Sequence, residues 1–147
     1  MPHKLSVIVT VGGPVALQSL NGANLITAAL TSAYQFSRET SLSNRLYVAT
    51  KDIDALRNAT RDLSIDFLEL QCDPTKPGEL ARALEPLEFE MVAIHDAQRP
   101  LTRSAQFHRA LEGLFGCDAV RPTMAFTETL KAVNESSELT HTINRTK

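Results

Sequence analysis

Short apolar runs alternate along this chain with longer stretches in which apolar residues recur at helical spacing. Residues 5–11 are rich in β-branched side chains and nearly all apolar, which is typical of a parallel strand covered on both faces. Similar runs predict further strands at 45–50, 65–70 and 89–94, and another that begins at 119–120.

Helices are predicted between these runs. Asn24, Asp52 and Ser104 are candidate N-caps, because each precedes apolar residues spaced three or four apart. A shorter helix is predicted over residues 78–84. Strands and helices that alternate at such intervals predict right-handed βαβ units and a doubly wound α/β fold with a parallel sheet.

The last third of the chain breaks this alternation. Residues 127–133 and 139–143 alternate polar with apolar side chains on either side of a turn-rich segment, which predicts a two-stranded arm. A lone hairpin is only marginally stable in water, so this arm is expected to pack against a second subunit.

Composition fits one domain, which we assign to residues 1–147 with the arm at about 125–146. The chain has 147 residues, is 43% hydrophobic and carries a net charge of −2. This charge gives no general electrostatic reason to expect a nucleic-acid partner or an anionic membrane surface. The apolar run 5–11 is too short to span a membrane. Two widely separated cysteines suggest neither a disulfide framework nor a zinc site, so a cytoplasmic location is expected.

Candidate chemistry gathers at residues 95–100, directly after a predicted strand. Ligands of open α/β sheets bind beyond the carboxyl ends of the strands. Asp96 is suited to hold a divalent cation or a ribose hydroxyl, and Arg99 to bind a phosphate. Taken alone, an aspartate and an arginine in a loop after a strand are more often a surface ion pair. Gly12 and Gly13 form either a phosphate loop or an ordinary tight turn. His95 is interpreted as a structural residue at the strand end.

Three ordered segments carry a family resemblance. The sequences HDAQRP at 95–100, TETLK at 127–131 and TINR at 142–145 resemble, in order and spacing, the motifs of the 2-C-methyl-D-erythritol 4-phosphate cytidylyltransferases. Residues 14–22 are similar to another segment of that family. The resemblance implies a Rossmann-like nucleotidyltransferase sheet with a protruding β-hairpin arm that forms a homodimer.

The same resemblance implies a reaction and its residues. The family transfers CMP from CTP to 2-C-methyl-D-erythritol 4-phosphate, releases pyrophosphate and uses Mg²⁺ in the non-mevalonate isoprenoid pathway. By position, Asp96 matches the aspartate that organises CTP and its magnesium, and Arg99 matches an arginine of the substrate phosphate region. Thr129 and Arg145 match residues that hold methylerythritol phosphate, Arg145 arriving from the partner subunit.

The chain also departs from the family pattern. The family's first loop contains a second spaced glycine and an arginine, whereas here Gly12 and Gly13 run directly into Pro14. The position of the family lysine is Val15, so no catalytic residue is assigned there. In the loop 72–77, Lys76 is either a replacement phosphate contact or a solvated side chain. The alternative function is therefore a catalytically impaired homologue, a dimeric module that binds a sugar phosphate or nucleotide.

Overall fold

The computed structural model describes residues 3–20, 22–123 and 131–143. Its centre is a four-stranded parallel sheet in the order β5-β4-β1-β6. The strands are β1 (His3–Thr10), β4 (Asn44–Thr50), β5 (Leu68–Gln71) and β6 (Phe89–Asp96). The chain steps outward from β1 to β4 and β5 and then returns to the other side of β1. The order therefore reverses between β1 and β6, the kind of point at which such sheets bind ligands.

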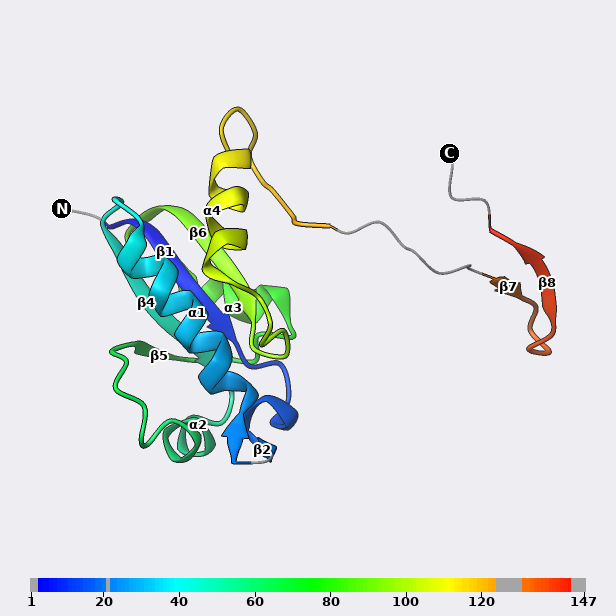
Figure 1. Ribbon diagram of the computed structural model, residues 1–147, viewed down its shortest axis with the longest axis horizontal. Helices are drawn as coiled ribbons and strands as arrows, with labels where there is room; N and C mark the ends of the chain where they lie inside the picture. Colours follow the sequence, from blue (N-terminus) through cyan, green and yellow to red (C-terminus); the bar gives the residue numbers. More distant parts are fainter. Residues whose placement is uncertain (1–2, 21, 124–130, 144–147) are drawn as a thin grey trace.

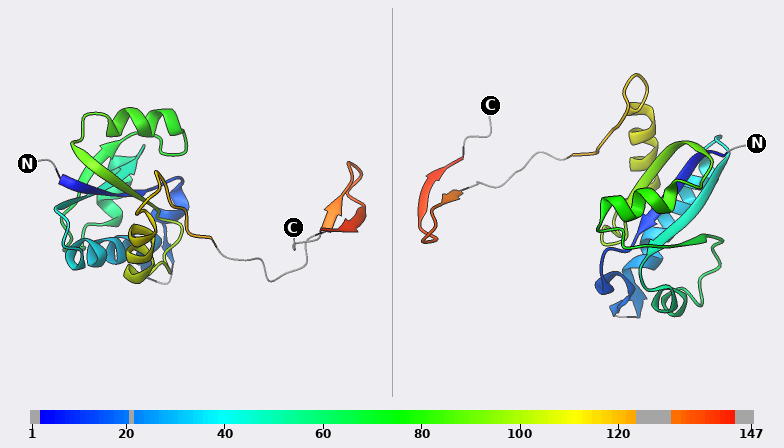
Figure 2. Two further views of the ribbon diagram at one scale, coloured as in Figure 1. Left: turned by 90° about the horizontal axis from the view of Figure 1, so that it is seen from above. Right: turned by 180° about the vertical axis from the view of Figure 1, so that it is seen from behind.

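Helices cover both faces of the sheet, as the left view of Figure 2 shows. Helices α1 (Leu25–Glu39) and α4 (Ser104–Gly113) lie on one face, and α3 (Pro77–Leu84) lies on the other. The short helix α2 (Ile53–Ala59) lies near the carboxyl end of the sheet. The doubly wound α/β fold predicted from the sequence is confirmed. No helix in the described part of the chain has the length and apolar character that a bilayer crossing demands.

Smaller elements follow β1, and two more lie among the last described residues. A 3-10 turn, η1 (Pro14–Leu17), leads into the short antiparallel pair β2 (Ser19–Leu20) and β3 (Ala23–Asn24). Near the C-terminus, β7 (Lys131–Val133) pairs antiparallel with β8 (Leu139–Thr142). Figure 1 shows this hairpin apart from the α/β body. The predicted pairing of two strands is thus found over these residues, while 127–130 lie outside the described ones.

The larger part of the core lies between the sheet and helices α1 and α4. Phe36 of α1 is fully buried and its ring stacks on Phe107 of α4, with 5.1 Å between ring centroids. Aromatic stacking of this kind adds to the burial of apolar area. A second cluster joins Ile8, Tyr47 and Ala49 of the sheet to Leu80 of α3. Together the two clusters hold the strands in place, so the loops at their carboxyl ends start from fixed positions.

Three local predictions were wrong. The strand predicted at 65–70 begins only at Leu68, since Ile65 and Phe67 pack against the core from an irregular segment. Residues 119–120 form no strand, and Val120 lies against Gly113 at the end of α4. Ser104 is the first residue of α4 rather than its cap.

The helix ends show why the caps differ from expectation. The Ser104 hydroxyl donates to the Glu39 carboxylate of α1, so it joins two helices instead of capping one. Arg103 occupies the N-cap, and its backbone N–H donates to the Gln106 side chain. Asp52 caps α2 as predicted, accepting from the Ala55 N–H at 2.9 Å. Asn24 holds the predicted N-cap position of α1, but its side chain donates to the Ala59 carbonyl.

Candidate functional site at the carboxyl edge of the sheet

Three loops meet where the parallel strands end. The strand register places Thr10 of β1 beside Asp96 of β6. The Ala97 N–H donates to the Thr10 carbonyl at 2.9 Å. On the other side of β1, the Val11 N–H donates to the Ala49 carbonyl of β4. The first loop, which follows β1, therefore runs between the loops that follow β6 and β4.

Gly12 and Gly13 lie close to side chains of neighbouring loops. Neither has a positive φ angle, since the positive-φ glycines among the described residues are Gly22 and Gly116. A Cβ on Gly12 would lie 3.3 Å from the Thr75 methyl carbon, and one on Gly13 would lie 3.4 Å from the Gln98 side-chain nitrogen. The first loop is thus packed closely between the loops after β5 and β6. Gly12 is itself exposed, and because glycine has no side chain a ligand can approach the backbone of this loop closely.

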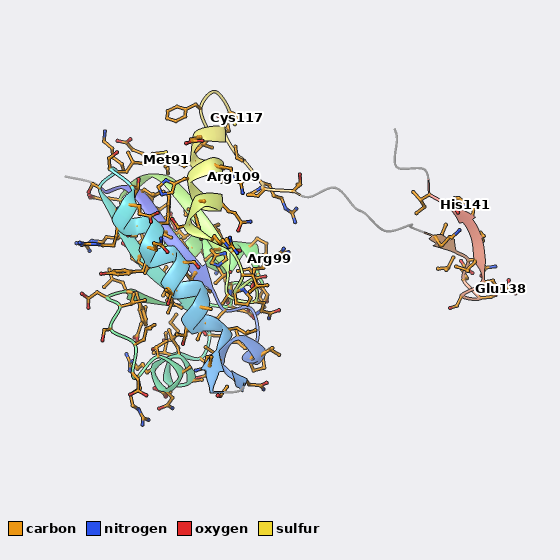
Figure 3. All side chains as sticks on the ribbon, in the orientation of Figure 1. Met91, Arg99, Arg109, Cys117, Glu138 and His141 are labelled. Atoms are coloured by element: carbon orange, nitrogen blue, oxygen red, sulfur yellow. The ribbon has the colours of Figure 1, made fainter. Side chains whose placement is uncertain are left out.

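Asp96 and Arg99 lie together on the turn after β6. The Asp96 Oδ1 accepts from the Gln98 N–H at 2.9 Å, and its Oδ2 lies 3.8 Å from the Arg99 Nε. The side chain of Arg99 is 74% exposed and that of Asp96 is 46% exposed. Figure 3 shows Arg99 on this turn, beside the carboxyl end of the sheet. The carboxylate is thus oriented by its own turn, and the guanidinium remains accessible to an anionic ligand.

The other predicted site positions are only partly accounted for. Val15 lies in η1 with 49% of its surface exposed, so no cation occupies that point of the first loop. Thr129 and Arg145 lie outside the described residues. The structure therefore brings together Gly12, Gly13, Asp96 and Arg99.

The loop after β5 is held by its own charges. Asp73 Oδ1 accepts from the Thr75 N–H at 3.1 Å and from the Thr75 hydroxyl at 2.6 Å. Lys76 Nζ lies 2.9 Å from Glu79 Oε1 and 3.8 Å from Asp73 Oδ2. The hydrogen bond to Glu79 raises the pKa of Lys76. This ammonium is already paired with two carboxylates, which weakens the interpretation of Lys76 as a phosphate contact.

Cys72 begins the same loop but is not an activated nucleophile. Burial, followed by the charges of Glu79 and Asp73, raises the pKa of its thiol. The thiolate is the reactive form of cysteine, so these surroundings suppress its nucleophilicity.

A cleft of about 650 Å³ opens on the α2 side of the first loop. Its walls include Gly13 and Pro14 of the first loop, Lys51 directly after β4, and Ala55 of α2. The sequence analysis did not single out Lys51. The available signal was its place directly after a predicted strand, where ligand-binding residues of α/β sheets gather.

His95 is a structural residue of the core, consistent with its interpretation from the sequence. Its side chain is buried and lies edge-on to Phe107, and no described residue forms a hydrogen bond with its Nε2. Burial lowers the pKa of His95 below its ordinary value, against the opposing charge of Asp96. The neutral imidazole is therefore the form that the folded protein favours.

This burial predicts a loss of stability in mild acid. Because the unfolded chain takes up a proton near pH 6.5 and folded His95 does so only at lower pH, the free energy of unfolding should fall as the pH drops through about 6.5. Urea unfolding at about pH 7.5 and 5.5 measures this change. The decrease in the free energy of unfolding between the two pH values should be smaller for His95→Leu than for the wild type. The matched variant His141→Leu, at an exposed hairpin position, should retain the wild-type loss. Equal losses for wild type and His95→Leu would contradict this account.

Comparison with known proteins shows which family the chain is most like. The family model described as IspD, 2-C-methyl-D-erythritol 4-phosphate cytidylyltransferase, matches residues 9–147. The chain belongs to this family. The match includes the first loop, the Asp96 turn and the hairpin, so the IspD resemblance noted in the sequence extends over nearly the whole chain.

Curated and solved IspD relatives are longer than this chain. The bifunctional enzyme IspD/IspF of Bradyrhizobium sp. strain BTAi1 is 30% identical over 139 residues, which cover 92% of this chain and 35% of that enzyme. The solved 4-diphosphocytidyl-2C-methyl-D-erythritol synthase of Anaerococcus prevotii is 18% identical, with a TM-score of 0.71 over 97% of this chain and 65% of that one. The Thermus thermophilus cytidylyltransferase is 21% identical, with a TM-score of 0.67 over 95% and 62% of the two chains. These structures support the nucleotidyltransferase fold.

Proposed function

We propose that this protein is a cytidylyltransferase that transfers CMP from CTP to 2-C-methyl-D-erythritol 4-phosphate and releases pyrophosphate. The observation that carries the proposal is the family match over residues 9–147, in a fold that places Gly12, Gly13 and Asp96 at one edge of the sheet. The chain spans about a third of the curated bifunctional relatives it matches and about two-thirds of the solved ones.

The reaction joins two anions. A phosphate oxygen of the sugar alcohol attacks the α-phosphorus of CTP, the bond from that phosphorus to the β-phosphate oxygen breaks, and pyrophosphate leaves. The protein's task is to position both substrates and to offset the negative charge in the transition state. We assign the nucleotide to the backbone of Gly12 and Gly13 and to Asp96. Arg99, Thr129 and Arg145 are assigned to the sugar phosphate.

A divalent cation, Mg²⁺ by preference, is part of this proposal. Among the described residues no group of three or more histidine, cysteine or carboxylate side chains gathers into an all-protein metal site. One carboxylate is sufficient for magnesium that is otherwise held by phosphate oxygens and water. Asp96 fits this requirement, because it is half-exposed and its Oδ2 faces no donor closer than Arg99 at 3.8 Å among the described residues. When bound there, the cation would neutralise charge on the triphosphate.

The direct test of the activity is pyrophosphate release by the purified chain with CTP, magnesium and methylerythritol phosphate. We expect release that requires all three components, because the proposed transfer consumes both substrates. Folded protein that binds the sugar phosphate or CTP without turnover would instead support the impaired, module-like homologue. The match to curated enzymes favours catalysis over that alternative.

A homodimer through the arm is a further part of the proposal. The hairpin presents Val133, Leu139 and Ile143 to solvent, with 59%, 71% and 43% of their surfaces exposed. A two-stranded hairpin that exposes large apolar side chains gains stability by packing on another surface. We propose that the arm, at about residues 125–146 of a single domain 1–147, crosses to a second copy.

Light scattering at micromolar concentration should therefore give the mass of two chains. Leu139→Asp places a charge on the apolar surface of the hairpin and is expected to shift the protein to monomers, because the charge must be desolvated in the interface. The matched variant Leu101→Asp, on the exposed turn after β6, should remain dimeric. A monomeric wild type, or a dimer that tolerates Leu139→Asp, would refute the arm as the interface.

We place the protein in the cytoplasm. The support for this is compositional: both cysteines, Cys72 and Cys117, are free thiols, as is usual for proteins of reducing compartments.

A further inference from the structure

Lys51 lies at the carboxyl edge of the sheet, at the start of the loop after β4 and between the loops that follow β1 and β5. The Val11 N–H donates to the Ala49 carbonyl, and the Cys72 N–H donates to the Thr50 carbonyl. These two bonds continue the hydrogen bonding between neighbouring strands up to the carboxyl edge of the sheet. Lys51, the residue directly after β4, is therefore flanked by the first loop on one side and by the Asp73 loop on the other.

The side chain of Lys51 is exposed and lines the 650 Å³ cleft beside Gly13 and Pro14. Among the residues described as lining this cleft, it is the sole cation. Asp52 also lines the cleft, but its Oδ1 accepts from the Ala55 N–H at the start of α2. The positive charge of Lys51 is thus presented next to the backbone of the glycine loop.

The other cations at this edge have different partners. Lys76 is bound by Glu79 and Asp73, and Arg99, which we assign to the sugar phosphate, lies 3.8 Å from Asp96. No ion pair joins Lys51 to a carboxylate in the described part of the chain. The charge of Lys51 also acts on Asp73. The pKa of Asp73 is lowered first by the Thr75 hydrogen bonds and more weakly by the charges of Lys76 and Lys51. An unpaired ammonium is the group best able to accept a new anionic partner.

We propose that Lys51 is the residue that binds the polyphosphate of the nucleoside triphosphate. This inference rests on the proposed function and adds a cation from the end of β4, a position outside the first loop. A triphosphate carries several negative charges, and a lysine ammonium binds phosphate as a point charge with three donors. Placed beside Gly13, it complements the backbone donors of the loop, while the apolar wall of Pro14, Leu17 and Ala55 is left for the less polar part of the ligand.

Calorimetric titration of CTP into the full chain, in buffer with magnesium, tests this assignment. Lys51→Ala should weaken CTP binding about tenfold or more, because it removes a charge-assisted hydrogen bond to the phosphate. Lys51→Arg should restore most of the affinity because it keeps the charge. Cytidine, which has no phosphate, should bind equally to all variants. The matched control is Lys4→Ala, an exposed lysine on β1 at the amino end of the sheet, which should leave CTP binding unchanged.

A parallel titration with inorganic tripolyphosphate separates this inference from the proposed function. If the wild type binds CTP and Lys51→Ala binds it equally well, the assignment of Lys51 is wrong and the proposed function stands. If the wild type binds tripolyphosphate in a Lys51-dependent way but does not bind CTP, the polyphosphate site stands and the cytidylyltransferase proposal fails. Binding of neither ligand to folded wild type overturns both.

Discussion

Replacement of Asp96 by asparagine is expected to lower the rate of pyrophosphate release about 100-fold or more, the usual cost of removing one electrostatic stabiliser of a transition state. The variant removes the negative charge with little change of shape. Asparagine Oδ1 can still accept from the Gln98 N–H, so the turn after β6 should keep its geometry. The loss would therefore report the missing charge, which holds the magnesium and the nucleotide in the proposed mechanism.

The matched control for this variant is Asp118→Asn. Asp118 is exposed and follows α4, which runs from the carboxyl edge of the sheet toward the opposite end. The same chemical change there should leave the rate of pyrophosphate release unaffected. If Asp96→Asn turned over at the wild-type rate, Asp96 would be only the partner of Arg99 in a surface ion pair.

Replacement of Phe36 by alanine should lower the free energy of unfolding by about 3–5 kcal/mol, as for other large aromatic residues removed from a core. Phe36 is 1% exposed, stacks on Phe107 and meets the edge of His108. Its removal would leave a cavity between α1 and α4, the two helices that cover one face of the sheet. Urea unfolding followed by circular dichroism measures the change.

Phe115→Ala provides the matched control for that prediction. Phe115 is 86% exposed just beyond α4, so its truncation should change the free energy of unfolding by no more than about 0.5 kcal/mol. Helical spacing alone would put Phe115 on the buried face of the helix, but α4 ends at Gly113. A large loss for Phe115→Ala, or a small one for Phe36→Ala, would show that the core lies elsewhere.

The sheet was predictable because each strand has a strong local pattern. Residues 5–11, 45–50 and 89–94 are largely apolar runs, and each is found as a strand with small shifts at its ends. The failures occur where tertiary contacts override local preference. Val120 lies against Gly113 instead of entering a strand, and Ser104 is drawn to Glu39 on another helix. Local pattern alone carries no information about either contact.

Part of the candidate site was also predictable from the sequence. The motif at residues 95–100 identified Asp96 and Arg99, and the parallel-sheet rule placed them beside the loop after β1. The sequence could not reveal that Thr75 and Gln98 pack against Gly12 and Gly13, because those contacts join loops that are far apart along the chain. It also could not reveal that Lys76 is held by two carboxylates while Lys51 has no ion pair in the described part of the chain.

The proposed transfer of a cytidylyl group at this edge of the sheet is tested by following the α-phosphorus of CTP. With label at that atom, excess enzyme, magnesium and methylerythritol phosphate, we expect the label to appear in the diphosphocytidyl sugar alcohol and the released pyrophosphate to be unlabelled. Label that stays in CTP, or that appears as CMP without a sugar product, would contradict it.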